Sequence, residues 1–235
     1  MRIKTSRLKT LSTLFGAGYD YIDIEAADGG WEAYAMSADL VTLMSARVPR
    51  EAFEEYAPQG RFEVAVKDLS DAIKHMGETT DVDLADGGAR LVLASGGMSI
   101  KVPLPPAPTE ERRRPKLPFS SGFVCDMDPI RKVVDASRSG IVRFRTSAEG
   151  LEVESLDEAG CGPKWTIPAA DMPSIEGEAS SGYGTAYVQQ FAAKFPKGSL
   201  ASVEFGSSFP MAMSYAIDMV EGTYIIAPIQ EEARR

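Results

Sequence analysis

The sequence contains few side chains that could carry out catalysis. His75 is the only histidine among 235 residues, and a hydrolytic triad would need it beside a serine or cysteine and an orienting carboxylate. It falls on the polar side of a short expected helix, so we do not expect it to be catalytic.

Cys125 and Cys161 stand far apart in the chain without a C-x-x-C spacing. This pattern gives no zinc motif, and it favours two free thiols that act as small buried hydrophobes over a disulfide.

Pairs of aspartates and of glycines also have simpler interpretations than a reactive site. Carboxylates two residues apart could bind a metal ion, but helix capping and solvation at strand edges explain them with fewer assumptions. Paired glycines between alternating runs are typical of hairpin turns and form no phosphate-binding fingerprint. The pairs are Asp81 and Asp83, Asp126 and Asp128, Gly87 and Gly88, and Gly96 and Gly97. We therefore expect no catalytic residue, no metal and no cofactor.

Composition limits the class of protein. A hydrophobic content of 44% is sufficient for a packed core. The net charge of −9 argues against a protein that coats nucleic acid, which would usually be basic, but it does not exclude one basic face on an acidic body. The first ten residues, MRIKTSRLKT, lack the apolar region of a signal peptide, and no run of about 18 apolar residues occurs, so we expect neither a leader nor a membrane span.

The order of expected elements occurs twice, with an offset of about 120 residues. Each half begins with a helix, continues through an acidic residue followed by glycine, forms a second helix and closes with alternating strands. The expected helices are 8–15, 67–76, 129–137 and 187–195, the turns are Asp28-Gly29 and Glu149-Gly150, and the closing strands are 82–94 and 202–217. Asp126 or Asp128 can cap the third helix, and PREAFEEY (49–56) fits a short helical turn or a loop. Strands outnumber helices, so the class is α+β with antiparallel sheet dominant.

Residues 105–118 (PPAPTEERRRPKLP) form the connector between the halves. Five of its residues are proline, which favours extended backbone and excludes a central strand. The segment is either a spacer or a docking edge for partner peptides, and composition alone favours the spacer. We place the domains at 1–104 and 119–235.

Basic side chains recur on all four expected helices, away from their apolar stripes. On one helix this is ordinary solvated surface, but its recurrence in an acidic chain indicates positive charge gathered on the helical side. Such a surface follows a phosphate backbone without reading bases. The residues are Arg7, Lys9, Lys74, Arg131, Lys132, Arg138, Lys194 and Lys197, with His75 facing solvent or DNA.

Three segments resemble the proliferating cell nuclear antigen (PCNA) sliding clamps, with an archaeal character. They are MSADLVTLMSARVPREAFEEY (36–56), the PKLPF sequence that ends the connector (115–119), and YIIAP (224–228) followed by acidic residues. The resemblance covers nearly the whole chain, in order. It implies two clamp domains with antiparallel sheets outside and short helices inside, and a homotrimer that closes a six-domain ring around DNA.

The resemblance also assigns the subunit edges and a peptide pocket. Residues 97–102 of one subunit would pair with 162–167 of the next, with apolar burial from Met98, Ile100, Val102, Trp165 and Ile167. A partner peptide would insert beneath the connector against Met36, Leu40, Val41, Leu43, Leu117, Pro210, Ile225, Ala227, Pro228 and Ile229. The implied partners are double-stranded DNA, a clamp loader, DNA polymerase, flap endonuclease and DNA ligase, the last three through PIP-type peptides. The implied location is the cytoplasm at the nucleoid, or the nucleus in a eukaryote.

Several residues depart from the family pattern. Ser37 stands where aspartate is usual, Leu40 replaces a common histidine, and Arg112-Arg113-Arg114 stand where acidic residues are frequent. These departures affect partner preference and not the expected fold. The alternatives are one subunit of a heterotrimeric clamp, a peptide-binding adaptor that does not bind DNA, and a small hydrolase or metal enzyme, for which we find no catalytic cluster.

Overall fold

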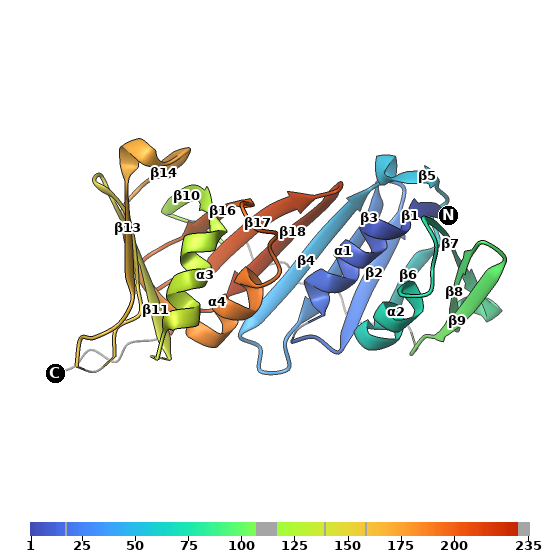
Figure 1. Ribbon diagram of the computed structural model, residues 1–235. Helices are drawn as coiled ribbons and strands as arrows, with labels where there is room; N and C mark the ends of the chain where they lie inside the picture. Colours follow the sequence, from blue (N-terminus) through green and yellow to red (C-terminus); the bar gives the residue numbers. More distant parts are fainter. Residues whose placement is uncertain (17, 107–116, 139, 158, 230–235) are drawn as a thin grey trace. The chain divides into compact units, whose positions relative to one another are not determined.

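The computed structural model forms two compact units and describes residues 1–16, 18–106, 117–138, 140–157 and 159–229. The first unit comprises Met1–Arg114 together with Ala216–Thr223, and the second comprises Pro115–Tyr215 together with Tyr224–Arg235 (Figure 1). Most of the connector, including Arg112-Arg113-Arg114, lies outside the described residues. Among those described, no helix combines the length and apolar character needed to cross a bilayer.

The first unit contains the elements of the first half in chain order. They are β1 (Arg2–Lys4), α1 (Thr5–Phe15), β2 (Tyr21–Ala27), β3 (Gly30–Met36), β4 (Thr42–Pro49), η1 (Arg50–Ala52), β5 (Phe53–Glu55), β6 (Gly60–Ala65), α2 (Val66–Ile73), β7 (Thr79–Ala85), η2 (Asp86–Gly88), β8 (Arg90–Ser95) and β9 (Met98–Pro103). The segment 49–56 is therefore a short 3₁₀ turn followed by a strand.

The second unit follows the same plan. Its elements are β10 (Ser121–Asp126), α3 (Met127–Ala136), β11 (Ile141–Ser147), β12 (Gly150–Glu154), β13 (Lys164–Pro168), η3 (Ala169–Asp171), β14 (Ser174–Glu176), β15 (Ala179–Gly184), α4 (Thr185–Ala192), β16 (Leu200–Phe205), β17 (Met211–Ile217) and β18 (Val220–Ile226). Equivalent strands β2 and β11 begin at Tyr21 and Ile141, and β3 and β12 begin at Gly30 and Gly150. The expected duplication and its offset are confirmed.

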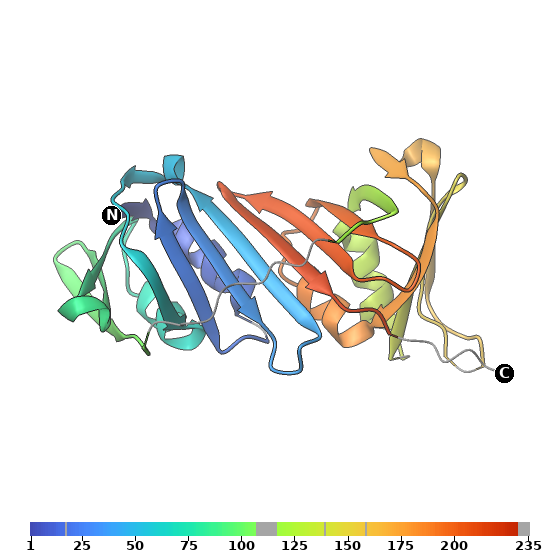
Figure 2. The ribbon, with the colours of Figure 1, turned by 180° about the vertical axis from the view of Figure 1, so that it is seen from behind.

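Antiparallel sheets bury the apolar stripe of each helix. In the first unit the strand orders are β5-β1-β7-β8-β9 and β4-β3-β2-β6, and in the second they are β14-β10-β16-β17 and β13-β12-β11-β15. Helix α1 buries Leu8, Leu11, Leu14 and Phe15, as its spacing predicts. Figure 1 shows the two helices of each unit on the same side of that unit's sheets, and Figure 2 shows the sheet side from behind. The expected α+β class is confirmed.

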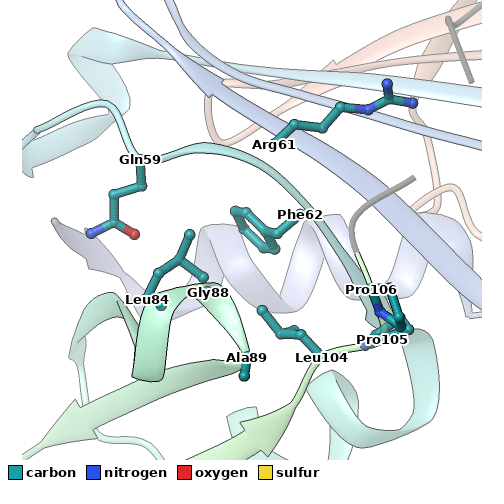
Figure 3. Close-up of a pocket in the computed structure, with 10 residues that line it drawn as sticks. Gln59, Arg61, Phe62, Leu84, Gly88, Ala89, Leu104, Pro105 and Pro106 are labelled. Carbon is teal, nitrogen blue, oxygen red and sulfur yellow. The ribbon is translucent and has the colours of Figure 1, made fainter. Parts of the chain in front are cut away.

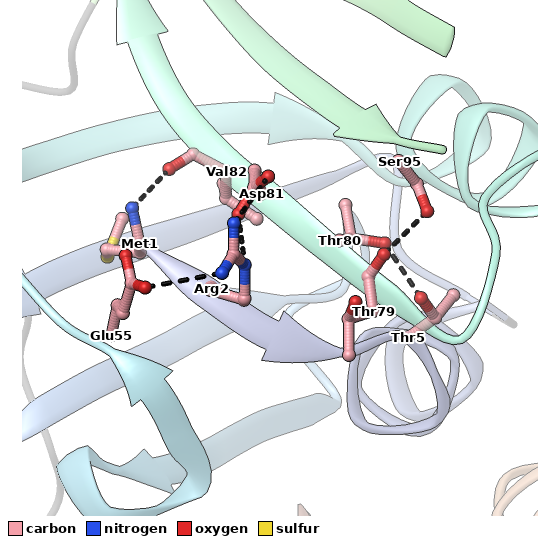
Figure 4. Close-up of polar contacts among 9 residues, drawn as sticks. All are labelled: Met1, Arg2, Thr5, Glu55, Thr79, Thr80, Asp81, Val82 and Ser95. Carbon is pink, nitrogen blue, oxygen red and sulfur yellow. Dashed lines mark hydrogen bonds and ion pairs between the residues drawn. The ribbon is translucent and has the colours of Figure 1, made fainter. Parts of the chain in front are cut away.

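Polar contacts hold β1 between β5 and β7 and set the start of α1 (Figure 4). The Met1 ammonium donates to the Val82 carbonyl at 2.9 Å. Thr5 and Thr80 join hydroxyls at 2.8 Å in a buried pair. Arg2 bonds Asp81 at 2.8 Å on the surface, where solvent screens the ion pair. In the second unit, the Asp126 side chain caps α3 by accepting from the Asp128 amide at 2.9 Å, which settles the choice of cap.

One glycine in each unit is required by a close backbone approach. Gly30 has φ +117°, and a Cβ there would meet the Val48 carbonyl oxygen at 2.2 Å. Its equivalent, Gly150, has φ +144° and would meet the Ile167 carbonyl oxygen at 2.1 Å. The Asp28-Gly29 turn lies directly before Gly30, and the Glu149-Gly150 turn includes Gly150. At both positions the neighbouring strand approaches so closely that a residue with a Cβ does not fit, so glycine is required.

We expect Gly30→Ala to destabilise the protein by at least about 2 kcal/mol, because it adds both a left-handed φ and a backbone clash. Urea denaturation followed by circular dichroism measures the loss. Gly29→Ala is the matched control, since nothing lies within 4 Å of the added Cβ. Equal stability of the two variants would contradict the close approach.

Candidate functional site

The helices of the first unit present basic side chains that are partly balanced by acids. Lys9 on α1 and Lys74 and His75 at the end of α2 are exposed. Asp71 lies 2.7 Å from both the Lys67 and the Lys74 ammonium groups. Their hydrogen bonds lower the pKa of the Asp71 carboxyl to about 2. Sequence reasoning missed Lys67, although its i,i+4 spacing to Asp71 is the usual signal for such a pair.

The second unit presents a more strongly positive helical surface. Lys132, Arg138 and Lys197 are exposed, and Lys194 is half-buried. Burial lowers the pKa of the Lys194 ammonium to about 8, because desolvation disfavours the charged form. Residues 185–199, which include α4 and the turn after it, contain no aspartate or glutamate. The positive charge of this segment comes from Lys194 and Lys197, which lie beyond the end of α4 at Ala192.

Two of the expected DNA-facing arginines have internal roles, and we correct those assignments. The Arg7 side chain is 11% exposed and pairs with Asp218 at 3.4 Å. Its guanidinium also donates to the Ala52 carbonyl. Arg131 is 20% exposed and pairs with Asp128 at 2.8 Å. Each guanidinium is occupied by its own unit, so its charge is not presented for phosphate contact.

Part of the expected peptide pocket belongs to the first unit and forms an exposed apolar turn. Met36 ends β3 and is 45% exposed, and Leu40 is 73% exposed at a φ of +60°. A leucine in the left-handed region costs about 1–2 kcal/mol. Ser37 braces the turn, since its hydroxyl donates to Asp39 at 2.5 Å and accepts from the Thr42 amide at 2.9 Å. Strain at an exposed apolar side chain marks this turn as a candidate contact.

The remaining expected pocket residues divide between accessible and buried. Val41 is half-buried in the first unit, whereas Leu43 is buried in its core and is removed from the set. In the second unit all the assigned side chains are half-buried. They are Leu117, Pro210, Ile225, Ala227, Pro228 and Ile229.

Two contacts fix the second-unit segments that carry these residues. The Ile229 amide donates to the Gly182 carbonyl at 2.9 Å, which ties down the chain after β18. The Tyr183 hydroxyl donates to the Phe209 carbonyl at 2.7 Å, next to Pro210. The second-unit part of the expected pocket therefore stands on backbone that is anchored to β15.

The two expected subunit edges are sheet edges. Strand β9 pairs only with β8 in its sheet, and β13 pairs only with β12. Met98 is exposed, and Ile100, Trp165 and Ile167 are half-buried. Val102 is buried within the first unit, so it does not offer its side chain at the edge, and we correct that assignment. Both edges carry unpaired backbone groups and accessible apolar side chains.

A pocket of about 570 Å³ lies between β6, the η2 turn and the start of the connector (Figure 3). Phe62, Leu84 and Leu104 give it an apolar lining. Its one charged side chain, Arg61, is paired with Asp23 at 2.7 Å. Throughout the part of the chain that the structure describes, no three His, Cys, Asp or Glu side chains gather as metal ligands. The pocket offers a binding surface without a nucleophile or a general base.

Comparison with known proteins agrees with this architecture. No family model matches the chain. It is 24% identical over 251 residues to DNA polymerase sliding clamp 2 of Thermococcus kodakarensis, covering 97% of this chain and 94% of the relative. It is 25% identical over 233 residues to the DNA polymerase sliding clamp of Pyrococcus abyssi, covering 91% of this chain and 90% of the relative.

Solved structures show the same fold. PCNA of A. fulgidus, in a structure with the C-terminal region of FEN-1 bound, matches with a TM-score of 0.88 at 21% identity, over 98% of both chains. PCNA from Thermococcus kodakaraensis matches with a TM-score of 0.85 at 19% identity, over 97% of this chain and 99% of that one. The chain is therefore similar in sequence, over nearly its whole length, to DNA polymerase sliding clamps, and it shares the fold of the PCNA structures.

Proposed function

We propose that the protein is a DNA polymerase processivity factor that closes a trimeric ring around duplex DNA. The observation that carries the proposal is a duplicated fold in which every unit has its helices on one side of its sheets, with exposed basic side chains on those helices or just beyond their ends. Among the end strands of the described sheets are β9 and β13, each paired on one side only. A ring of such units needs no catalytic group, because its shape performs the function.

Ring closure uses the edges β9 and β13. An unpaired strand with accessible apolar side chains invites pairing with another chain, and closed cyclic assembly removes both edges at once. Ile100 and Trp165 supply apolar area for this contact. Because the two edges differ, each interface is head-to-tail, which is the arrangement that forms rings.

The charge distribution suits a ring that slides. The chain has a net charge of −9, and an acidic body resists unspecific adhesion to DNA. Exposed cations on the helices favour the duplex within the hole through sequence-independent phosphate contacts. Retention on DNA then depends on topology, and a few weak contacts leave the ring free to move.

Partner enzymes dock through short peptides in this proposal. The exposed turn with Met36 and Leu40 and the anchored second-unit segment with Ile225 and Pro228 would receive an apolar anchor and an extended chain. A solved relative, PCNA of A. fulgidus, holds the C-terminal region of FEN-1. We accordingly propose polymerase, flap endonuclease and ligase as partners, an ATP-driven loader, and a site of action at the nucleoid of an archaeal-type cell.

A heterotrimeric ring is the second candidate. It is favoured by the resemblance to the PCNA2–PCNA3 complex of Sulfolobus tokodaii, which has a TM-score of 0.80 at 20% identity. In a heterotrimer, β9 and β13 of this chain would pair with other clamp subunits, and the purified chain alone would not form a trimer.

We expect Ile100→Asp to convert the trimer into monomers, because it places a charge in an apolar interface. The association constant should fall at least about tenfold. Light scattering over a concentration series measures the assembly, and circular dichroism tests that the monomer is folded. Ser99→Asp is the matched control, since neighbouring residues of a strand point to opposite faces. A trimer that tolerates Ile100→Asp would contradict the proposed edge.

We expect Lys194→Glu with Lys197→Glu to preserve the trimer but reduce loading or processivity, because it replaces two cations by anions where phosphate would lie. Primer extension on a singly primed circle, with loader and polymerase, measures product length. The unaltered protein must lengthen the products for the proposed function to stand. Products of unchanged length from the double variant would place these residues away from the duplex.

DNA affinity should decline as the pH rises from 7 to 9. Lys194, with its pKa lowered to about 8, is mainly charged below that pH and mainly neutral above it. Loss of one phosphate contact should weaken binding by about twofold to fivefold at low salt. Lys194→Arg keeps its charge throughout, so its affinity should stay level. An equal decline in that variant would assign the pH dependence to another group.

A further inference from the structure

The guanidinium of Arg131 binds the end of the neighbouring helix α4. Its Nη2 donates to the carbonyls of Ala192 at 2.8 Å and Phe195 at 2.7 Å. Its Nε also donates to the Ala192 carbonyl, at 3.2 Å. Ala192 is the last residue of α4, and its carbonyl also accepts from the Phe195 amide at 3.3 Å. Arg131 therefore adds donors at a helix end, where carbonyls lack their regular helical partners. The cation also lies at the negative end of the helix dipole.

Asp128 extends this contact to the far side of the turn. Its Oδ1 accepts from Arg131 at 2.8 Å, and its Oδ2 accepts from the Gly198 amide at 3.2 Å. Gly198 has φ +72°, the conformation that ends the turn. One ion pair on α3 therefore binds both the beginning and the end of the segment 193–198. We call this segment the lysine turn.

The core holds the lysine turn from the other side. Phe195 is buried, with its ring centroid 4.8 Å from that of Phe191 and 4.4 Å from that of Tyr215. Lys194 and Lys197 flank this anchor, and no acid lies on the segment. Their backbone is fixed on two sides, so ordering it at a phosphate would cost little conformational entropy.

The first unit lacks this arrangement. The amide of Thr5 donates to Glu78 and that of Met127 donates to Ser199, which makes the starts of α1 and α3 equivalent. By this correspondence, Ser6 and Lys9 stand where α3 has Asp128 and Arg131. In the first unit, moreover, Lys74 is paired with Asp71 on its own helix. The two units therefore offer unequal surfaces to an anion.

We propose that Arg131 is a positioning residue that holds the lysine turn as the main phosphate-contacting element, so that each protomer contacts the duplex chiefly through its second unit. The inference rests on the proposed function and assigns unequal roles to the two halves. Arg131 acts through Lys194 and Lys197 and does not itself contact DNA. Its four hydrogen bonds inside the unit occupy the guanidinium.

A double-mutant cycle tests this role. The affinity for a short labelled duplex is measured by fluorescence anisotropy over a salt series. The variants are Arg131→Gln, Lys194→Gln with Lys197→Gln, and the combination. We expect Arg131→Gln to weaken binding about fivefold in the natural background and less than about twofold when both lysines are absent. Equal loss in both backgrounds, or no loss in either, would overturn the inference.

Two further measurements separate positioning from charge and from folding. Amide hydrogen exchange of the lysine turn should become faster in Arg131→Gln, whereas unchanged exchange would contradict a positioning role. Arg131→Lys retains the charge but cannot bond both carbonyls and Asp128. Arg131→Lys should weaken DNA binding as much as Arg131→Gln does. If Arg131→Gln does not fold, Arg131→Lys is used in its place. Affinity equal to that of the natural protein would overturn the inference.

Measurements on the unaltered protein separate a failure of the role proposed for Arg131 from a failure of the proposed clamp function. If the unaltered protein neither binds the duplex nor lengthens polymerase products, the proposed function fails and the inference fails with it. If it does both and the cycle is additive, the clamp function stands and only the role of Arg131 is lost.

Discussion

The unpaired edges of the sheets are the constraint on which the structure depends. Strands β9 and β13 each have a strand partner on one side only. A backbone group without a partner is costly when it is buried and attracts other chains when it is exposed. In the proposed function, pairing of β9 with β13 of a second copy satisfies both edges, and repetition of that contact closes a ring. The proposed roles of the helical surface and of the turn with Met36 and Leu40 depend on this closure.

The two units share one fold, but their surfaces differ. Close backbone approaches at Gly30 and Gly150 are retained in both units, because the strand beneath leaves no room for a side chain. Polar residues on the helices have no such constraint. Asp71 offsets two lysines in the first unit, while Arg131 in the second supports a turn that has no acid. The two units therefore have the same fold but differ in the charge on their helical sides.

Much of the fold was predictable because it depends on local patterns. The stripe of α1, the glycine pairs at hairpins and the repeat of element order each arise from residues close together in the chain. The basic character of the helices was predictable for the same reason. Lys9, Lys132 and Lys197 are exposed, as expected from their places off the apolar stripes.

The corrections concern contacts that a local pattern cannot show. Arg7 bonds Asp218, which lies 211 residues away, and Arg131 bonds Phe195, 64 residues away. Leu43 was assigned to a pocket, but the first three residues of β4 are all buried, so alternation fails there. Val102 faces the core of its own unit at an edge where an outward side chain was expected. In each case the residue's contacts depend on tertiary packing, which the local sequence pattern does not reveal.

The central claim is that the protein holds DNA by encircling it. The most direct measurement is the lifetime of labelled protein loaded onto a closed circular duplex, before and after one cut by a restriction enzyme. Encirclement predicts long retention on the circle and rapid loss from the linear ends, with little dependence on salt before the cut. Equal lifetimes on the circular and linear DNA, both falling steeply with salt, would contradict it and indicate surface binding.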